Sequence, residues 1–179
     1  MADIASNTTT AGLWNAAGRR FGDRVFLVHL DADGGRVEFG YAQFARLIHQ
    51  AAHAFRSVGV APGDAVLLQL HNRPETLMAL FGLAEIGAIA VPLNRDATPS
   101  ELLQAYRACG ARWAVVEDCL LDVHRRLRAE EGVAIQGLLG VSDFAALGSR
   151  QPDDPITDVV LTDLTVAELL YTSGTTAAP

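Results

Sequence analysis

The sequence contains no lysine: arginine supplies all 14 side chains of the Lys and Arg class, set against 21 acidic residues and a net charge of -7. This absence excludes lysine chemistry, such as a Schiff base or a lysine contact to phosphate, from these residues. An acidic chain without a basic patch is also not typical of a nucleic-acid-binding protein. We therefore expect no nucleic-acid partner.

The sequence also contains few cysteines and no long apolar run. The two cysteines, Cys109 and Cys119, form no CxxC pair, so we expect two reduced thiols, with no disulfide and no metal site. No apolar run approaches the roughly 18 residues that a membrane-spanning helix needs. The N-terminal residues lack the charged-then-apolar layout of a signal peptide, which predicts a cytoplasmic protein without a transmembrane segment.

The remaining composition is that of a folded domain, because 50% of the residues are hydrophobic and 20% are charged. A length of 179 residues suits one compact domain or a part of a larger one. Residues 1–12, rich in Thr, Ala and Asn, are expected to form a flexible N-terminus. Residues 13–179 are expected to form the folded part.

Hydrophobic periodicity divides these residues into alternating helices and strands. Apolar residues at three- and four-residue steps are clearest in 41–58, and Thr98 to Glu101 reads as a capping box with Pro99 at the first helical position. The expected helices span 13–20, 41–58, 74–86, 99–110 and 119–130. The expected strands span 23–30, 36–40, 65–70, 88–91, 113–116, 134–141 and 166–171, and residues 148–165 are expected to form a surface connection.

The order of these elements predicts an α/β fold. Residues 31–35 (DADGG) are typical of the turn of an N-terminal β-hairpin that joins 23–30 to 36–40. From residue 65 onwards, strands and helices alternate at the spacing of βαβ units. We expect a mostly parallel, doubly wound sheet that is flanked by helices.

Small hydroxylated residues follow the last expected strand, in Tyr171 to Pro179 (YTSGTTAAP). Gly174 allows backbone N–H groups to approach an anion closely, and the hydroxyl groups of the neighbouring Ser and Thr residues add donors. In open α/β sheets ligands bind beyond the carboxyl ends of the strands, where this loop would lie. From spacing alone, a phosphate-binding loop and a plain polar turn are equally supported, and the Walker pattern is absent.

The segment YTSGTT at 171–176 resembles the phosphate-binding core of the AMP-forming acyl-activating (adenylate-forming) superfamily, which includes acyl-CoA synthetases, peptide-synthetase adenylation domains and luciferases. In the family the motif continues with Gly, any residue, Pro, Lys and Gly, whereas this sequence continues with Ala177, Ala178 and Pro179. If position 177 requires a positive φ, Ala costs about 1 kcal/mol or more there, and if φ is negative the change is mild.

Four further segments are similar to the family in its order and spacing. The ending Val-Pro-Leu-Asn at 91–94 favours the acyl-CoA synthetase branch. The resemblance covers 13–179, and its segments are 37–47 (VEFGYAQFARL), 63–74 (GDAVLLQLHNRP), 83–94 (LAEIGAIAVPLN) and 98–117 (TPSELLQAYRACGARWAVVE).

The resemblance implies a partial N-terminal domain of a larger ligase, with residues 13–179 ending inside the phosphate-binding loop. The implied enzyme uses ATP, Mg²⁺ and coenzyme A to convert a carboxylic acid to acyl-AMP and then to acyl-CoA. The family's acyl pocket, adenine-binding segment, metal-binding acid and catalytic lysine all follow the loop, so we expect no catalytic residue in this chain and no activity from it alone. The residues to which the resemblance assigns the ATP phosphates are Thr172, Ser173, Gly174, Thr175 and Thr176.

A second hypothesis is a non-catalytic α/β module that binds a nucleotide or another protein. A truncated edge of the fold would leave apolar surface unburied, which predicts self-association. His49 and His53 have a metal-compatible spacing on one helix, but no matching carboxylate or thiol accompanies them, so they are interpreted as solvated or interfacial. Arg125, Arg126 and Arg128 are interpreted as favourable charges at a helix C-terminus.

Overall fold

The computed structural model describes residues 9–31 and 33–171. The α-helices are α1 (Thr10–Phe21), α2 (Tyr41–Ser57), α3 (Pro74–Glu85), α4 (Pro99–Cys109), α5 (Leu121–Glu130) and α6 (Val141–Gly148), and a 3₁₀ turn, η2 (Asp118–Leu120), precedes α5. The strands are β1 (Val25–Leu30), β2 (Arg36–Gly40), β3 (Ala65–Gln69), β4 (Ile89–Pro92), β5 (Trp113–Val116) and β6 (Gly137–Gly140).

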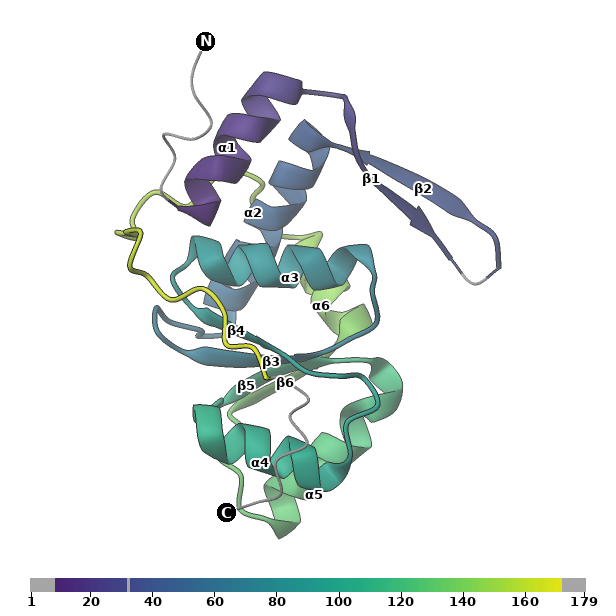
Figure 1. The fold of residues 1–179 in the computed structure, drawn as a ribbon, viewed down its shortest axis with the longest axis vertical. Helices are drawn as coiled ribbons and strands as arrows, with labels where there is room; N and C mark the ends of the chain where they lie inside the picture. Colours follow the sequence, from purple (N-terminus) through teal and green to yellow (C-terminus); the bar gives the residue numbers. More distant parts are fainter. Residues whose placement is uncertain (1–8, 32, 172–179) are drawn as a thin grey trace.

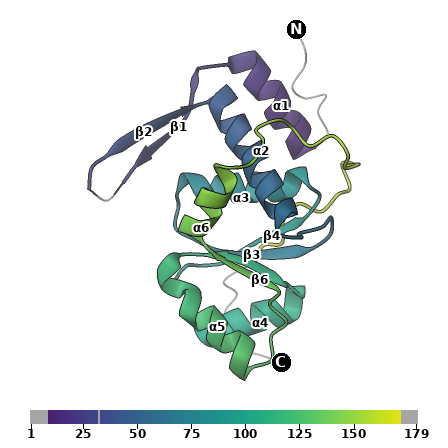
Figure 2. The same cartoon turned by 180° about the vertical axis from the view of Figure 1, so that it is seen from behind.

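The main sheet is parallel throughout and has the order β4-β3-β5-β6. Helices α2, α3 and α6 cover one face, and α4 and α5 cover the other (Figures 1 and 2). Strand β3 is buried at all five positions, which explains why Ala65 to Leu68 are all apolar; its last residue, Gln69, is buried and polar. Its side chains alternate between the layers: Val66 and Leu68 pack with α2 and α3, whereas Ala65 and Leu67 pack with α4. The predicted α/β, doubly wound fold is confirmed.

The predicted hairpin is also confirmed, as an antiparallel pair of β1 and β2 that projects from the body of the molecule (Figure 1). Asp31 holds its turn by accepting hydrogen bonds from the N–H groups of Asp33 and Gly35. Phe26 at the base of the hairpin packs edge-on against Trp14 of α1, with 4.8 Å between ring centroids. These aromatic contacts attach the hairpin to α1 and α2.

Helix α1 begins at Thr10, three residues before the expected start. Thr9 caps the helix, because its hydroxyl group accepts a hydrogen bond of 3.1 Å from the N–H of Gly12. Residues 10–12 of the expected flexible N-terminus are therefore helical, while residues 1–8 lie outside the described part.

Helix α6 is an element that the sequence analysis missed. Its N-cap position is Gly140, which has no side chain, so no local capping signal marks its start. The cap comes instead from Asp118, whose carboxylate accepts hydrogen bonds from the N–H and the hydroxyl group of Ser142. A cap supplied 24 positions away cannot be read from the local sequence.

The strand expected at 166–171 is reduced to one isolated parallel bridge between Ala90 and Glu168. The N–H of Ala90 donates to the carbonyl of Ala167, and the N–H of Leu169 donates to the carbonyl of Ala90, both at 2.9 Å. The neighbouring rungs fail because the N–H of Ala88 is used by Leu83 and because Pro92 has no N–H. The segment therefore lies beside β4, as Figure 1 shows, but without a continuous ladder.

Two other boundaries differ from expectation. The helix expected over 119–130 divides into η2 and α5, and the strand expected over 134–141 is confined to β6. The capping box of α4 is present as predicted, with Thr98 accepting from the N–H of Glu101 and Glu101 accepting from the N–H of Thr98. No helix in the described ranges is long and apolar enough to cross a membrane.

Candidate functional site

The predicted phosphate-binding residues Thr172, Ser173, Gly174, Thr175 and Thr176 lie outside the described residues. The described chain ends at Tyr171, whose hydroxyl group donates to the carbonyl of Ala105 in α4 at 3.4 Å. Partial burial raises the pKa of the Tyr171 hydroxyl group, so it remains a protonated donor at neutral pH. The chain that leads to the loop is thus attached both to β4 and to α4.

Parallel strands bring their carboxyl ends to one edge of the sheet. At this edge, β4 leads into a loop at 93–98, β3 into a loop at 70–73, and β5 into Glu117. The segment ending at Tyr171 runs parallel to β4, so it ends at the same edge. The polar groups of this edge are the ones available to a ligand held by the predicted loop.

A buried chain of hydrogen bonds supports the loop after β4. The hydroxyl group of Tyr106 lies 2.7 Å from Nδ1 of His124, and Nε2 of His124 lies 2.7 Å from Oε1 of Gln69. The amide nitrogen of Gln69 donates at 2.8 Å to the carbonyl of Arg95. Three side chains from β3, α4 and α5 thereby hold the backbone of one surface loop.

The protonation states follow from this geometry. Burial lowers the pKa of His124 to about 4, so its ring is neutral at pH 7, and burial raises the pKa of Tyr106. Tyr106 therefore donates to Nδ1 of His124, and the N–H at Nε2 donates to Gln69. The three side chains in this series of hydrogen bonds then each have a hydrogen-bond partner.

The sequence analysis did not predict this series of hydrogen bonds. The one visible signal was Gln69 inside an apolar strand, since a buried amide requires hydrogen-bond partners.

The loop after β4 is a compact turn that presents Arg95. The N–H of Ala97 donates to the carbonyl of Asn94, and the N–H of Asp96 donates to the side-chain oxygen of Asn94, both at 3.0 Å. Nη1 of Arg95 donates to the exposed Asp96 at 2.9 Å. Nε of Arg95 is buried and has no hydrogen-bond partner among the described residues.

A second arginine at the same edge has two carboxylate partners. Arg73 donates from Nε to Glu75 at 2.8 Å and from Nη1 to Glu117 at 3.3 Å. Glu117 also accepts from the N–H of His71. The hydrogen bond to Glu75 is the main reason that the pKa of Arg73 is raised. Arg73 therefore ties the end of β3 to the end of β5.

The two histidines of α2 are interfacial, which is one of the two interpretations given above. His49 is buried, and its Nδ1 lies 2.8 Å from Oε2 of Glu85, whose other oxygen accepts from the N–H of Ile156. Nε2 of His53 lies 3.1 Å from the carbonyl of Asp154. Within residues 9–31 and 33–171, no group of three or more His, Cys, Asp or Glu side chains could hold a metal ion.

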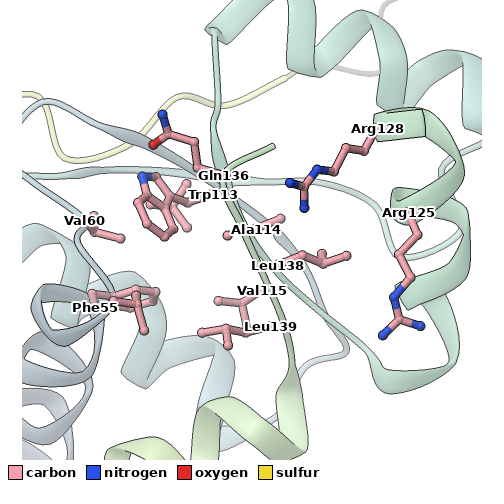
Figure 3. A pocket seen from close by; sticks show the side chains of 13 residues that line it. Phe55, Val60, Trp113, Ala114, Val115, Arg125, Arg128, Gln136, Leu138 and Leu139 are labelled. Atoms are coloured by element: carbon pink, nitrogen blue, oxygen red, sulfur yellow. The ribbon is translucent and has the colours of Figure 1, made fainter. Parts of the chain in front are cut away.

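A separate groove of about 390 Å³ lies along β6, at the edge of the sheet far from β4. Figure 3 shows Trp113 and Phe55 on one side of it, and Arg128 reaching from α5 towards the strands on the other. The Trp113 ring lies over Gly137, where a Cβ atom would come within 2.3 Å of it. The groove is lined from β3, β5 and β6 but not from β4, which borders the segment ending at Tyr171, so it is not included in the candidate site.

The described chain superposes on large parts of several solved structures. It superposes on a fatty acyl CoA synthetase of Mycobacterium tuberculosis with a TM-score of 0.82 and 21% identity, over 93% of this chain and 33% of that one. It superposes on a long-chain-fatty-acid-CoA ligase of Archaeoglobus fulgidus with a TM-score of 0.80 and 19% identity, over 94% and 35% of the two chains. At these identities the likeness establishes the fold.

The sequence comparisons identify relatives with named activities. A crotonobetaine/carnitine–CoA ligase of Salmonella heidelberg (strain SL476) is 30% identical over 187 aligned residues. The matched region is 99% of this chain and 36% of that protein, so the chain spans about a third of its relative's length. The family model described as AMP-binding enzyme matches residues 14–179. Because this match covers nearly all of its length, the chain belongs to the AMP-binding enzyme family.

Proposed function

We propose that this chain is the N-terminal, phosphate-binding portion of an ATP-dependent acyl-CoA synthetase. The family match over residues 14–179, which includes the YTSGTT segment, is the observation that carries the proposal. The structure supports it, because the chain leading to that segment reaches the carboxyl edge of a parallel sheet. The matched relatives carry names of ligases that act with coenzyme A, in agreement with this assignment.

The proposed reaction has two halves. The carboxylate of the acid attacks the α-phosphate of ATP, which forms acyl-AMP and releases pyrophosphate, and the thiol of coenzyme A then displaces AMP. Negative charge moves towards the leaving pyrophosphate in the first half. Backbone N–H groups and the hydroxyl groups of Thr172, Ser173, Thr175 and Thr176 would stabilise that charge by donating hydrogen bonds to the β- and γ-phosphates.

Mg²⁺ is proposed to accompany ATP, as the family resemblance implies. Mg²⁺ bound with a nucleotide takes its ligands mainly from phosphates and water, with one or two protein carboxylates, so it does not require the cluster of three candidate ligands that the described residues lack. The acid, ATP and coenzyme A are the proposed partners, together with the remainder of a longer enzyme. The use of ATP and coenzyme A agrees with the cytoplasmic location expected from the sequence.

The test is an NMR titration of the ¹⁵N-labelled 179-residue chain with ATP, using adenosine as the control without phosphates. We expect ATP to shift the amide signals of residues 172–176, and the double variant Thr175→Val, Thr176→Val to bind ATP at least about tenfold more weakly. This is the size of one or two lost hydrogen bonds to a charged group. The exposed Thr157→Val is the matched control and should bind as the wild type does.

We further propose that the 179 residues bind the phosphates without completing the reaction. A pyrophosphate-release assay with a panel of carboxylic acids should therefore give no acid-dependent signal. Acid-dependent release from the purified chain would contradict this part of the proposal. ATP shifts that are absent from residues 172–176 would contradict the phosphate-binding role itself.

A further inference from the structure

Strand β6 forms the edge of the parallel sheet opposite β4. The N–H of Gly137 donates to the carbonyl of Arg112, so the backbone of Gly137 faces β5 and the backbone of Leu138, one residue on, faces away from the sheet. Within residues 9–31 and 33–171, no strand pairs with this outer side. The unpaired N–H and C=O groups of such an edge can bind another strand.

The groove of about 390 Å³ along β6 indicates which side chains such a strand would carry. Apolar side chains, among them Phe55 and Leu139, lie on one side of β6, and Arg128 lies on the other (Figure 3). Arg128 is exposed and forms no ion pair with another described side chain, whereas Arg125 beside it pairs with Asp122. The groove therefore suits a strand that is apolar on one side and offers a carboxylate on the other.

The segment beside β4 presents a second open edge. Its bridge to Ala90 uses the carbonyl of Ala167 and the N–H of Leu169, so the N–H and C=O of Glu168 face away from β4. While the segment is bridged to β4 it cannot reach β6 of its own copy, because β4 and β6 are at opposite edges of the sheet. A second copy can bring the two edges together.

The apolar side chains of this segment match the apolar side of the groove. Val166 and Leu170 lie on the same face as Glu168, because side chains of an extended chain alternate between faces. Glu168 shares that face with its bridge partner Ala90, which packs in the same core cluster as Phe55. A copy that continued the sheet in parallel would therefore turn Val166 and Leu170, which are 51% and 72% exposed, towards the apolar side of the groove.

The charges match in the same arrangement. Arg128 lies in the last turn of α5, which ends where the chain turns towards β6, and the exposed Asp163 precedes the residues that would align with β6. A parallel arrangement brings these two side chains to the same end of the sheet. Because the chain carries a net charge of -7, which opposes contact between copies, a local pair of opposite charges favours this contact over others.

We propose that the edge of β6 is a docking surface for a second copy of this chain, whose residues 163–171 add to the sheet in parallel. Each copy offers the segment at one edge of its sheet and receives a segment at the other. The two surfaces in contact are different, so the association is head-to-tail and can continue from copy to copy.

An exchange of the two charges tests this contact by sedimentation velocity. Arg128→Glu and Asp163→Arg should each weaken the association at least about tenfold, because like charges then meet across the interface. An equimolar mixture of the two variants should recover it, since every contact between unlike copies then joins opposite charges. Arg126→Glu, at an exposed arginine of α5 that does not line the groove, is the matched control and should associate as the wild type does.

Amide spectra of each variant at low concentration report whether the fold is retained. The indole N–H signal of Trp113, which lines the groove, should shift as the wild type associates. The proposal is overturned if Arg128→Glu associates as strongly as Arg126→Glu, or if the mixture associates no more than either variant alone. A wild-type chain that stays monomeric, or that associates without a shift at Trp113, overturns it as well.

Discussion

At the scale of single residues, three buried polar side chains link the interior of the protein to the loop after β4. Tyr106, His124 and Gln69 are buried and form a continuous series of hydrogen bonds that ends on the backbone of Arg95. In such a series each member depends on the protonation state of the next. His124 is the member that titrates nearest to neutral pH.

His124 should therefore make the stability of the protein depend on pH. Its folded-state pKa of about 4 lies below the ordinary value of 6.5, so the unfolded state binds the proton more tightly. The free energy of unfolding should fall as the pH drops through this interval, by about 2 kcal/mol for this residue between about pH 7.5 and about pH 5.

Urea denaturation at the two pH values measures this effect in the wild type and in His124→Gln, which cannot titrate. His53→Gln, at a partly buried histidine of α2, serves as the control and should retain the wild-type pH dependence. An equal loss of stability in the wild type and in His124→Gln would rule out His124 as the source.

At the scale of secondary-structure elements, the availability of backbone N–H donors in and beside β4 decides where the sheet ends. The segment at 166–171 has an apolar, strand-like sequence, yet it forms one bridge, because Pro92 lacks a donor and Ala88 has already used its own. The extent of pairing is therefore limited by the missing donors at the ends of β4 and not by the sequence of the segment at 166–171.

Pro92→Ala should lengthen this pairing. The new N–H at position 92 faces the same side as the N–H of Ala90, so it can donate to the carbonyl of Leu169 and extend the ladder by one rung. Amide hydrogen exchange at Leu169 and Tyr171 should slow several-fold, relative to the global exchange rate. Pro152→Ala, an exposed proline far from β4, should leave these amides unchanged. Unchanged exchange in Pro92→Ala would show that another factor limits the pairing.

The elements that the sequence predicted are those whose signals are local. The continuous apolar run of β3, the periodicity of α2 and the capping box of α4 each lie within a few neighbouring residues. The missed features depend on distant partners, such as the cap that Asp118 gives to α6. In the candidate site, Thr172 to Thr176 remain a prediction from family resemblance, whereas the support for Arg95 joins residues 55 and 18 positions apart and could not be read from spacing.

At the scale of the whole molecule, apolar surface gathers near the C-terminal end of the described chain. Large apolar side chains are exposed along 160–171, with Val160 at 91%, Leu164 at 86% and Leu170 at 72%. Large exposed apolar side chains within one short segment favour a contact region in soluble proteins.

We therefore predict that the 179-residue chain self-associates through the exposed apolar side chains of residues 160–171. Sedimentation velocity over a hundredfold range of protein concentration should show a rising weight-average mass. The double variant Leu164→Ser, Leu170→Ser should reduce the rise, while Leu30→Ser, at a 65%-exposed leucine of the hairpin, should not. A wild-type chain that stays monomeric throughout would refute the prediction.

The single bridge between Ala90 and Glu168 also bears on the order in which parts of the protein fold during synthesis. All four strands of the parallel sheet and the five helices that cover its faces lie before residue 149. During synthesis the sheet can therefore close before the last segment emerges from the ribosome, since domains fold from their N-terminal side. Residues 149–171 would then dock late on a finished sheet, and errors in their placement would leave the core of the fold intact.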